Sequence, residues 1–475
     1  MAPGYLSKAL RELGLAAVWT SDYNVKLLYI QRFVRRFAYG GSTLILVDYL
    51  STIGVSEAQI GLFMTLTLIG DVGISLVLTT FADGLGRRAV LAVGAISMAF
   101  SGVVFAMSSN FWLLLFAAIF GVISPSGNEI GPFKAVEEST LAHLVPAQRR
   151  TDIYAWYSLA GEAGTALGLL LTGWSITYMT VQRGWDDIRT YRIIFYGYAI
   201  CGFIKLILTI LLNKVVEADK TPRSMPLRDS ESAPFLGDDA KVVEVKESCM
   251  RSILPKISKE SRVIVANLCI LFGIDAFASG MASMSWIAYF FKEKFDVEGG
   301  ELGSILSVTK FIAALSVLVA STIAKRFGNV KTMAFTHLPS SIFLAIIPFP
   351  SSLAFATFFL IIRSCTQSMD NAPRSAFLAA VVLPNERTAI MGIVNVVKTA
   401  AQSMAPLVTG ILVERGKFWV MFVLAGSLKV AYDLGLLAMF AGHEKEEHWE
   451  ERDERVQRDR SAVELRELAG SERSD

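Results

Sequence analysis

Apolar segments long enough to cross a membrane recur along the whole chain. A membrane helix requires about 20 mainly apolar residues. The pattern predicts twelve such helices, and a long polar stretch separates the first six from the last six. The predicted ranges are 33–53, 57–80, 89–108, 111–131, 152–178, 192–213, 263–290, 300–324, 332–349, 353–382, 388–413 and 417–441. The fold predicted from this pattern is an all-α membrane protein with twelve transmembrane helices in two pseudo-symmetric six-helix bundles.

Composition and loop charges set the expected domains and orientation. The chain is 53% hydrophobic with a mean hydropathy of +0.47, an excess typical of membrane proteins. Lys and Arg gather in the loops on one side, for example at Arg87, Arg88 and Arg387. The positive-inside rule then places both termini in the cytosol of a multi-pass protein, expected in the plasma membrane. The predicted segments are a cytosolic N-terminal segment at 1–32, bundles at 33–213 and 263–442, a largely disordered cytosolic linker at 214–262 and a charged cytosolic tail at 443–475.

The two apolar halves resemble each other in sequence. Four features occur in the same order in both halves. They are a loop with a glycine, two apolar spans, a polar pair before a proline, and an Arg-Thr pair that opens an apolar helix. The matched segments are Ala82-Asp83-Gly84-Leu85-Gly86 with Ala324-Lys325-Arg326-Phe327-Gly328, Asn128-Glu129 and Pro132 with Asp370-Asn371 and Pro373, and Gly173 with Gly410. Two similar hydrophobic halves are typical of proteins that move a solute through the interface between them.

Charged residues inside the predicted spans are the main candidates for a transport pathway, because a charge in a bilayer is costly and usually faces a cavity or a partner. For Asp48, Lys205 and Lys429, near span ends, we expect the side chains to reach the membrane surface. The deeper candidates for a substrate or proton pathway are Asp71, Asn128, Glu129, Glu162, Asp275, Lys310, Arg363, Asp370, Asn371, Arg374 and Lys398.

These charges allow two interpretations. In the first, carboxylates of the first half (Asp71, Glu129 and Glu162) carry protons, while cations of the second half hold an anionic or zwitterionic solute. In the second, the charges pair within each half and only stabilise the bundles. The matched pairs Asn128-Glu129 and Asp370-Asn371 lie beside glycine or proline, which interrupts a helix, and interrupted helices often form transport sites. The alternative is that they are kinks needed for packing.

The loop Phe81-Ala82-Asp83-Gly84-Leu85-Gly86-Arg87-Arg88 resembles the signature loop of the major facilitator superfamily. The usual pattern is Gly-x-x-x-Asp-Arg-x-Gly-Arg-Arg, matched here at Asp83, Gly86, Arg87 and Arg88. The resemblance covers roughly residues 30–442 and implies a gating loop, in which Asp83 binds near a helix N-terminus of the other half and the arginines pair with carboxylates on helix ends. The alternative is that Gly86 only makes a tight turn. The glycines of the fifth span, without proline, favour helix packing.

Other function classes find no support in the sequence. A net charge of +2 gives no reason to expect nucleic-acid binding. No catalytic cluster, metal-binding histidine spacing or P-loop is present, so we expect neither an enzyme, a metal nor a cofactor. The function predicted is a secondary active transporter of a small organic solute, proton-coupled, embedded in the lipid bilayer as a monomer. The alternatives are a membrane sensor or scaffold with a transporter fold, and, among transporters, an efflux pump rather than an importer.

Overall fold

The computed structural model describes residues 18–121, 123, 125, 132–146, 149–217, 259–370, 373–374, 377–378, 381–382 and 386–440. Within these ranges the chain is helical and contains no β-strand. The elements are α3 (Tyr23–Thr52), α4 (Glu57–Leu85), α5 (Arg87–Met107), α6 (Phe111–Gly121), α7 (Pro132–Leu144), α8 (Arg150–Thr177), the π-helical turn η2 (Tyr178–Gln182), α9 (Asp187–Ile210), the 3₁₀ turn η3 (Lys214–Val216), α10 (Lys259–Met281), α11 (Met284–Phe295), α12 (Gly299–Phe327), α13 (Asn329–Ile346), α14 (Leu353–Thr366), α16 (Arg387–Glu414) and α17 (Phe418–Phe440).

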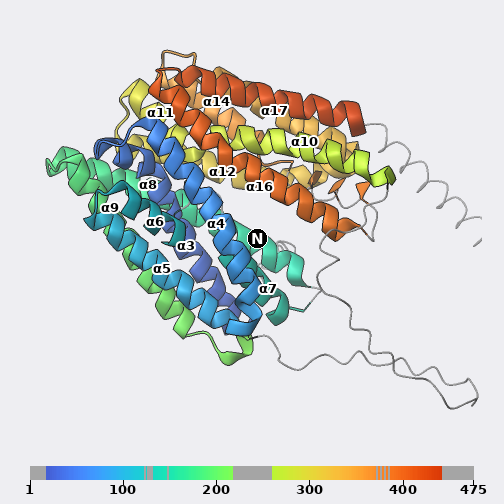
Figure 1. The fold of residues 1–475 in the computed structure, drawn as a ribbon, viewed down its shortest axis with the longest axis horizontal. Helices are drawn as coiled ribbons and strands as arrows, with labels where there is room; N and C mark the ends of the chain where they lie inside the picture. The colour runs from blue at the N-terminus through green and yellow to red at the C-terminus, as the bar shows by residue number, and fades with distance from the viewer. Residues whose placement is uncertain are drawn as a thin grey trace, which may run out of the picture.

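The helices form two groups that correspond to the two halves of the sequence. In Figure 1 the N-terminal helices α3 to α9 (blue to green) and the C-terminal helices α10 to α17 (yellow to red) lie together at the left and diverge toward the right. Within the first half α3 packs on α8 and α5 on α9; within the second, α10 packs on α16 and α13 on α17. Between the halves, α8 packs on α12 and α4 on α16. The same pairings thus occur twice, as the repeated sequence predicts.

Twelve membrane crossings follow when broken helices are joined. Six of the described helical segments are each long and apolar enough to cross a membrane, and α6 and α14 are shorter apolar helices. The fourth crossing comprises α6 and α7, the seventh α10 and α11, and the tenth α14 with the helical residues that follow it. The predicted fold of two helical membrane bundles is confirmed.

Several boundaries differ from the sequence prediction. The fourth span, predicted to end at residue 131, extends through α7 to Leu144. The first span begins at Tyr23 and not at residue 33, because Arg32 is buried inside α3 instead of lying before it. The seventh span, predicted as continuous over 263–290, breaks after Met281 and resumes at Met284. Ser283 at the break has an extended backbone, which ends the helical hydrogen-bond pattern there.

Glycines allow several helices to touch through their backbones, as small residues do in membrane proteins. A Cβ added at Gly168 would lie 2.0 Å from the carbonyl oxygen of Phe37, so α8 and α3 are in direct contact. Between the halves, a Cβ at Gly61 would lie 2.5 Å from the carbonyl oxygen of Pro406, and one at Gly173 would lie 2.3 Å from that of Gly299. The predicted packing role of the glycines in the fifth span is confirmed, and Gly173 extends it to the contact between the halves.

Replacing Gly168 with valine should destabilise the N-terminal half by about 1–3 kcal/mol, the usual cost of overpacking a well-packed site. The cause is the clash with the Phe37 carbonyl. The matched control is Gly197→Val on α9, where nothing lies within 4 Å of an added Cβ. The measurement is the apparent unfolding temperature of the purified protein in detergent. Equal unfolding temperatures for the two variants would contradict the backbone contact.

Candidate functional site

A buried ion cluster joins four helices of the N-terminal half. Arg35 on α3 donates two hydrogen bonds to the carboxylate of Glu137 on α7, at 2.7 and 2.8 Å. Lys205 Nζ on α9 lies 3.6 Å from the same carboxylate, and the hydroxyl of Tyr157 on α8 donates to it. The side chains of Glu137 and Lys205 are 0% and 1% exposed. We name Arg35, Glu137, Tyr157 and Lys205 the N-half cluster.

A second cluster lies at the corresponding place in the C-terminal half. Asp275 on α10 accepts a hydrogen bond from Lys429 Nζ on α17 at 2.7 Å, and its other oxygen is 3.1 Å from a guanidinium nitrogen of Arg374. Arg374 also bonds Asp370, four residues earlier. The side chains of Asp275, Lys429 and Arg374 are 6%, 7% and 14% exposed. We name Asp275, Asp370, Arg374 and Lys429 the C-half cluster.

The C-half cluster continues into a buried histidine. His337 Nδ1 on α13 lies 2.9 Å from an oxygen of Asp433, and His337 Nε2 lies 4.0 Å from Asp275. The Ser341 hydroxyl donates to Asp433 at 3.0 Å. Lys398 on α16 is within electrostatic range of Asp275 and has its Nζ 5.7 Å from the centre of the Phe272 ring. Sequence analysis missed His337 because a single histidine in an apolar span carries no motif.

The two clusters are related by the internal repeat. Arg35 precedes Phe37-Ala38-Tyr39-Gly40, and Asp275 precedes Phe277-Ala278-Ser279-Gly280 at the same spacing. Lys205 follows Gly202 by three residues, and Lys429 follows Gly426 by three. The residue on the first helix is therefore a cation, Arg35, in the N-terminal half and an anion, Asp275, in the C-terminal half. Glu137 supplies the opposite charge in the first case and Arg374 in the second. This repeat of Gly-x-x-Lys is the sequence signal that could have identified both lysines.

The prediction that Lys205 and Lys429 reach the membrane surface is wrong, whereas Asp48 is partly exposed near the end of α3. Lys205 and Lys429 belong to the two buried clusters. Asp48 on α3 accepts a hydrogen bond from Lys292 Nζ on α11 at 2.6 Å and one from the Tyr191 hydroxyl at 3.1 Å. Their partners lie on helices distant in sequence, which hydropathy alone does not reveal.

The Asp48–Lys292 pair joins the two halves at one end of the molecule. This end, where α3 ends and α4 and α12 begin, also contains the contacts of Gly61 and Gly173. A further hydrogen bond across the halves runs from the Gly300 N–H to the Thr177 hydroxyl at 2.8 Å. We call this end of the molecule the closed end.

A third group of charges involves both halves. Arg36 on α3 donates to Glu162 on α8 at 2.8 Å, and Glu162 is 35% exposed. Lys310 on α12 is within electrostatic range of Arg36, Glu162 and Arg363, the last of which lies on α14. Within the described part of the chain, no ion pair or hydrogen bond is made by Lys310 or Arg363. We name Arg36, Glu162, Lys310 and Arg363 the central group.

Asp71 differs from the other predicted site residues because it is isolated. It lies near the middle of α4 and is 7% exposed. Its Oδ1 is buried, and it has no hydrogen-bond partner among the described residues. The predicted residues thus separate into the C-half cluster with Lys398, the central group, and Asp71 alone. Asn128, Glu129 and Asn371 lie outside the described residues.

The gating loop is held within its own half. Glu217, just after η3, accepts hydrogen bonds from the backbone N–H of Arg87 at 2.7 Å and of Arg88 at 3.3 Å, so a carboxylate caps α5. The guanidinium groups of Arg87 and Arg88 donate to the backbone carbonyls of Val216 and Ile210. The resemblance implies a carboxylate on a neighbouring helix end, and Glu217 supplies it. This carboxylate binds the backbone N–H groups of Arg87 and Arg88 and not their guanidinium groups.

Glycines turn the chain at both copies of this loop. Gly86 has φ +91° and Gly328 has φ +85°, a conformation that favours glycine. The tight-turn interpretation of Gly86 is thus supported. The side chain of Asp83 lies outside the described part, so its contact with the other half stays a prediction.

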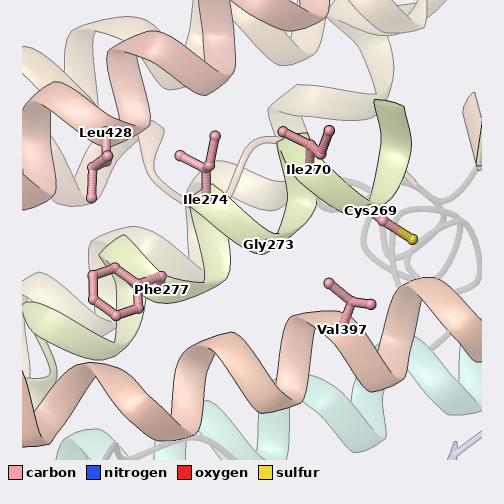
Figure 2. A pocket seen from close by; sticks show the side chains of 7 residues that line it. All are labelled: Cys269, Ile270, Gly273, Ile274, Phe277, Val397 and Leu428. Carbon is pink, nitrogen blue, oxygen red and sulfur yellow. The ribbon is translucent and has the colours of Figure 1, made fainter. Parts of the chain in front are cut away.

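Two cavities among the described residues have no charged side chain in their lining. One of about 480 Å³ lies between α10 and α16, where Figure 2 shows Ile270, Ile274, Phe277 and Val397 around it. Another of about 630 Å³ is enclosed by α3, α8 and α9 and is mostly apolar. Neither contains an ionisable group that could bind a charged solute. Among the described residues, no group of three or more His, Cys, Asp or Glu could hold a metal ion.

Comparison with known proteins agrees with the geometry. The family model described as Major Facilitator Superfamily matches residues 28–274 and again 268–472. An uncharacterised membrane protein of Saccharomyces cerevisiae is 36% identical over 422 residues, which cover 88% of this chain and 94% of that protein. Quinolone resistance protein NorA of Staphylococcus aureus is 23% identical over 186 residues, or 39% of this chain and 44% of NorA.

Solved structures share the fold at low sequence identity. The nucleoside transporter NupG has a TM-score of 0.65 at 16% identity, covering 88% of this chain and 99% of NupG. An inward-facing bacterial homologue of the human lysosomal transporter Spinster has a TM-score of 0.61 at 14% identity, covering 88% and 94%. Together with the family match, these findings confirm the predicted resemblance and identify a multi-pass membrane transporter and not an enzyme.

Replacing Glu137 with glutamine should destabilise the protein by about 3–5 kcal/mol, because Arg35 and Lys205 would lose the buried carboxylate that both of them contact. The neighbouring Glu138→Gln is the control. Glu138 is 37% exposed and lies 3.8 Å from Lys134, a pair worth at most about 1 kcal/mol. Thermal unfolding of the purified variants measures the difference. If both variants unfolded at the same temperature, the N-half cluster would not hold the bundle together.

Proposed function

Since the chain belongs to the major facilitator superfamily, we propose that it is a secondary active transporter that moves a small organic solute by alternating access and is coupled to protons. The observation that carries this proposal is the contrast between the inside of each half and the contact between the halves. Each half is joined internally by a buried ion cluster, whereas the described contacts across the halves gather at the closed end.

This contrast suits a transporter whose halves rock against each other. Buried, multiply bonded charges keep each half rigid, because breaking one such pair is strongly unfavourable. The contacts at the closed end are of a kind that can separate, since the backbones touch at Gly61 and Gly173 and the side chains beside them make single hydrogen bonds, such as Trp174 Nε1 to the Ser304 hydroxyl at 3.1 Å. The Asp48–Lys292 pair is partly exposed, with side-chain exposures of 14% and 32%. Rocking would open this end and close the other.

Asp71 is the residue we propose as proton carrier. A carboxylate inside a membrane helix is costly when charged, and Asp71 has neither a hydrogen bond at Oδ1 nor a cation to offset the charge among the described residues. Binding a proton removes that cost, and releasing it requires a different environment. A change of environment is what rocking of α4 against α16 would supply.

The orientation and assembly proposed with this function follow the sequence prediction. Both termini face the cytosol, the protein works as a monomer, and it resides in the plasma membrane. The closed end then faces outward, and the end at which the two halves diverge in Figure 1 faces the cytosol. Export is the second candidate for the direction of transport. Partial similarity to a quinolone resistance protein supports it.

Asparagine in place of Asp71 should abolish accumulation driven by a pH gradient but preserve exchange of solute for solute, since exchange needs no net proton movement. The protein would be reconstituted in liposomes and incubated with a metabolite mixture, with and without the gradient. Mass spectrometry of the vesicle contents gives solute and direction together. The control is Asp187→Asn, an exposed carboxylate at the start of α9. Full pH-driven accumulation by Asp71→Asn would exclude Asp71 as the proton carrier, and no solute movement by the wild type would favour a sensor.

Asp48→Asn should reduce the population of the conformation in which the two halves touch at the closed end. The expected change is about 1 kcal/mol, or roughly fivefold in the ratio of this conformation to the one in which they separate there. The cause is loss of the ion pair with Lys292. Spin labels on exposed Thr52 and Lys417, at the closed end of the two halves, report the separation after the four native cysteines are replaced. Asp152→Asn, an exposed carboxylate in the first turn of α8, serves as control. An unchanged distance distribution for Asp48→Asn would show that this pair does not hold the closed end.

A further inference from the structure

We propose that the central group binds a small solute through an oxyanion, a carboxylate or phosphate. This inference deepens the proposed function by naming the substrate class. Four cations of the second half are candidates for solute binding from the sequence, and the structure divides them. Arg374 is bonded to Asp275 and Asp370, and Lys398 lies beside the same carboxylates. Lys310 and Arg363 remain for a solute.

The position of the central group suits a transport site. Its members come from α3 and α8 of one half and from α12 and α14 of the other. Arg36, Glu162 and Lys310 each lie near the middle of a long helix. In transporters built from repeats, the substrate site lies near the bilayer midplane between the halves. A solute bound here would contact both halves and would sense their rocking.

The charge balance of the central group favours an anion. Arg36 and Glu162 offset each other through a direct hydrogen bond at 2.8 Å. Lys310 and Arg363 add two positive charges, and the described residues near them supply no further carboxylate. Buried charges of one sign repel and require a counter-charge, which an anionic solute would provide.

The type of cation points to an oxyanion. The Nε of Arg363 is buried and has no hydrogen-bond partner among the described residues. A guanidinium presents its N–H groups in a planar fork that fits carboxylate and phosphate oxygens, and an ammonium such as Lys310 adds a point charge. Glu162 lies half-buried beside Arg36. Its negative charge would disfavour a second anionic group on the part of the solute that faces it.

Ligand-induced stabilisation of the full-length purified protein tests the inference without requiring transport. The oxyanion probes are succinate and glycerol 3-phosphate, which separate a carboxylate from a phosphate preference. Their neutral counterparts are succinamide and glycerol, and 1,4-diaminobutane is the cationic counterpart. Ionic strength is kept constant with chloride. At least one oxyanion should raise the unfolding temperature in a saturable manner, because a ligand that binds only the folded state stabilises it. The counterparts should not.

Variants assign the effect to the central group. Lys310→Gln and Arg363→Gln should each weaken oxyanion binding about tenfold or more, since each removes a charge-assisted contact. Lys331→Gln, which removes an exposed charge on α13, should bind as the wild type does. Glu162→Gln adds positive charge and should retain or strengthen binding, an outcome that misfolding cannot produce. If neither oxyanion stabilised the wild type, if diaminobutane did so equally, or if both cation variants bound normally, the inference would be wrong.

The oxyanion site and the proposed transport function can be contradicted independently of each other. Binding to the central group without flux of any solute in liposomes would leave the oxyanion site standing and would contradict the transporter proposal. Flux of a neutral or cationic solute alone would support a transporter and contradict the oxyanion site.

Discussion

The structure depends on one constraint, which is that a charge inside a membrane bundle needs a partner. Each half meets this constraint in the same place with opposite signs. Arg35 on the first helix of one half finds Glu137, and Asp275 on the first helix of the other finds Arg374 and Lys429. Because the partners come from different helices, every such bond also fixes the positions of those helices. Electrostatics inside each half therefore determines packing as well as local charge balance.

The contacts between the halves follow a different physical rule. They rest largely on glycines, where backbones approach closely, together with single hydrogen bonds such as those of Thr177 and Ser304. Gly61 meets Gly410, and Gly173 meets Gly303, so the two seams are related by the internal repeat. A rigid interior and a smooth interface together favour movement of whole halves over deformation of single helices. The partly exposed pair of Asp48 and Lys292 adds a polar contact that water can replace when the halves separate.

The sequence predicted what depends on local patterns and failed where partners are distant. The number of spans, the packing glycines of α8 and the turn at Gly86 follow from apolar runs and small residues, and the structure agrees. Arg35 is not among the sequence candidates, because its partner Glu137 lies 102 residues away and only the fold brings the two together. The break after Met281 also escaped prediction, since no proline marks it. Of the candidate site, charges inside the predicted spans revealed most of the C-half cluster and of the central group, whereas Arg36, Glu137 and His337 were missed. Tertiary structure then separated these residues into clusters.

The separation into clusters also distinguishes structural from functional charge. In the N-half and C-half clusters, every cation has a carboxylate within 4 Å, and the side chains are almost fully buried. In the central group, Lys310 and Arg363 lack such a partner among the described residues, and Glu162 is more exposed. A membrane protein gains no stability from unbalanced buried cations, so their retention requires another reason. A solute that brings its own negative charge provides that reason, and it places the site where both halves contribute residues.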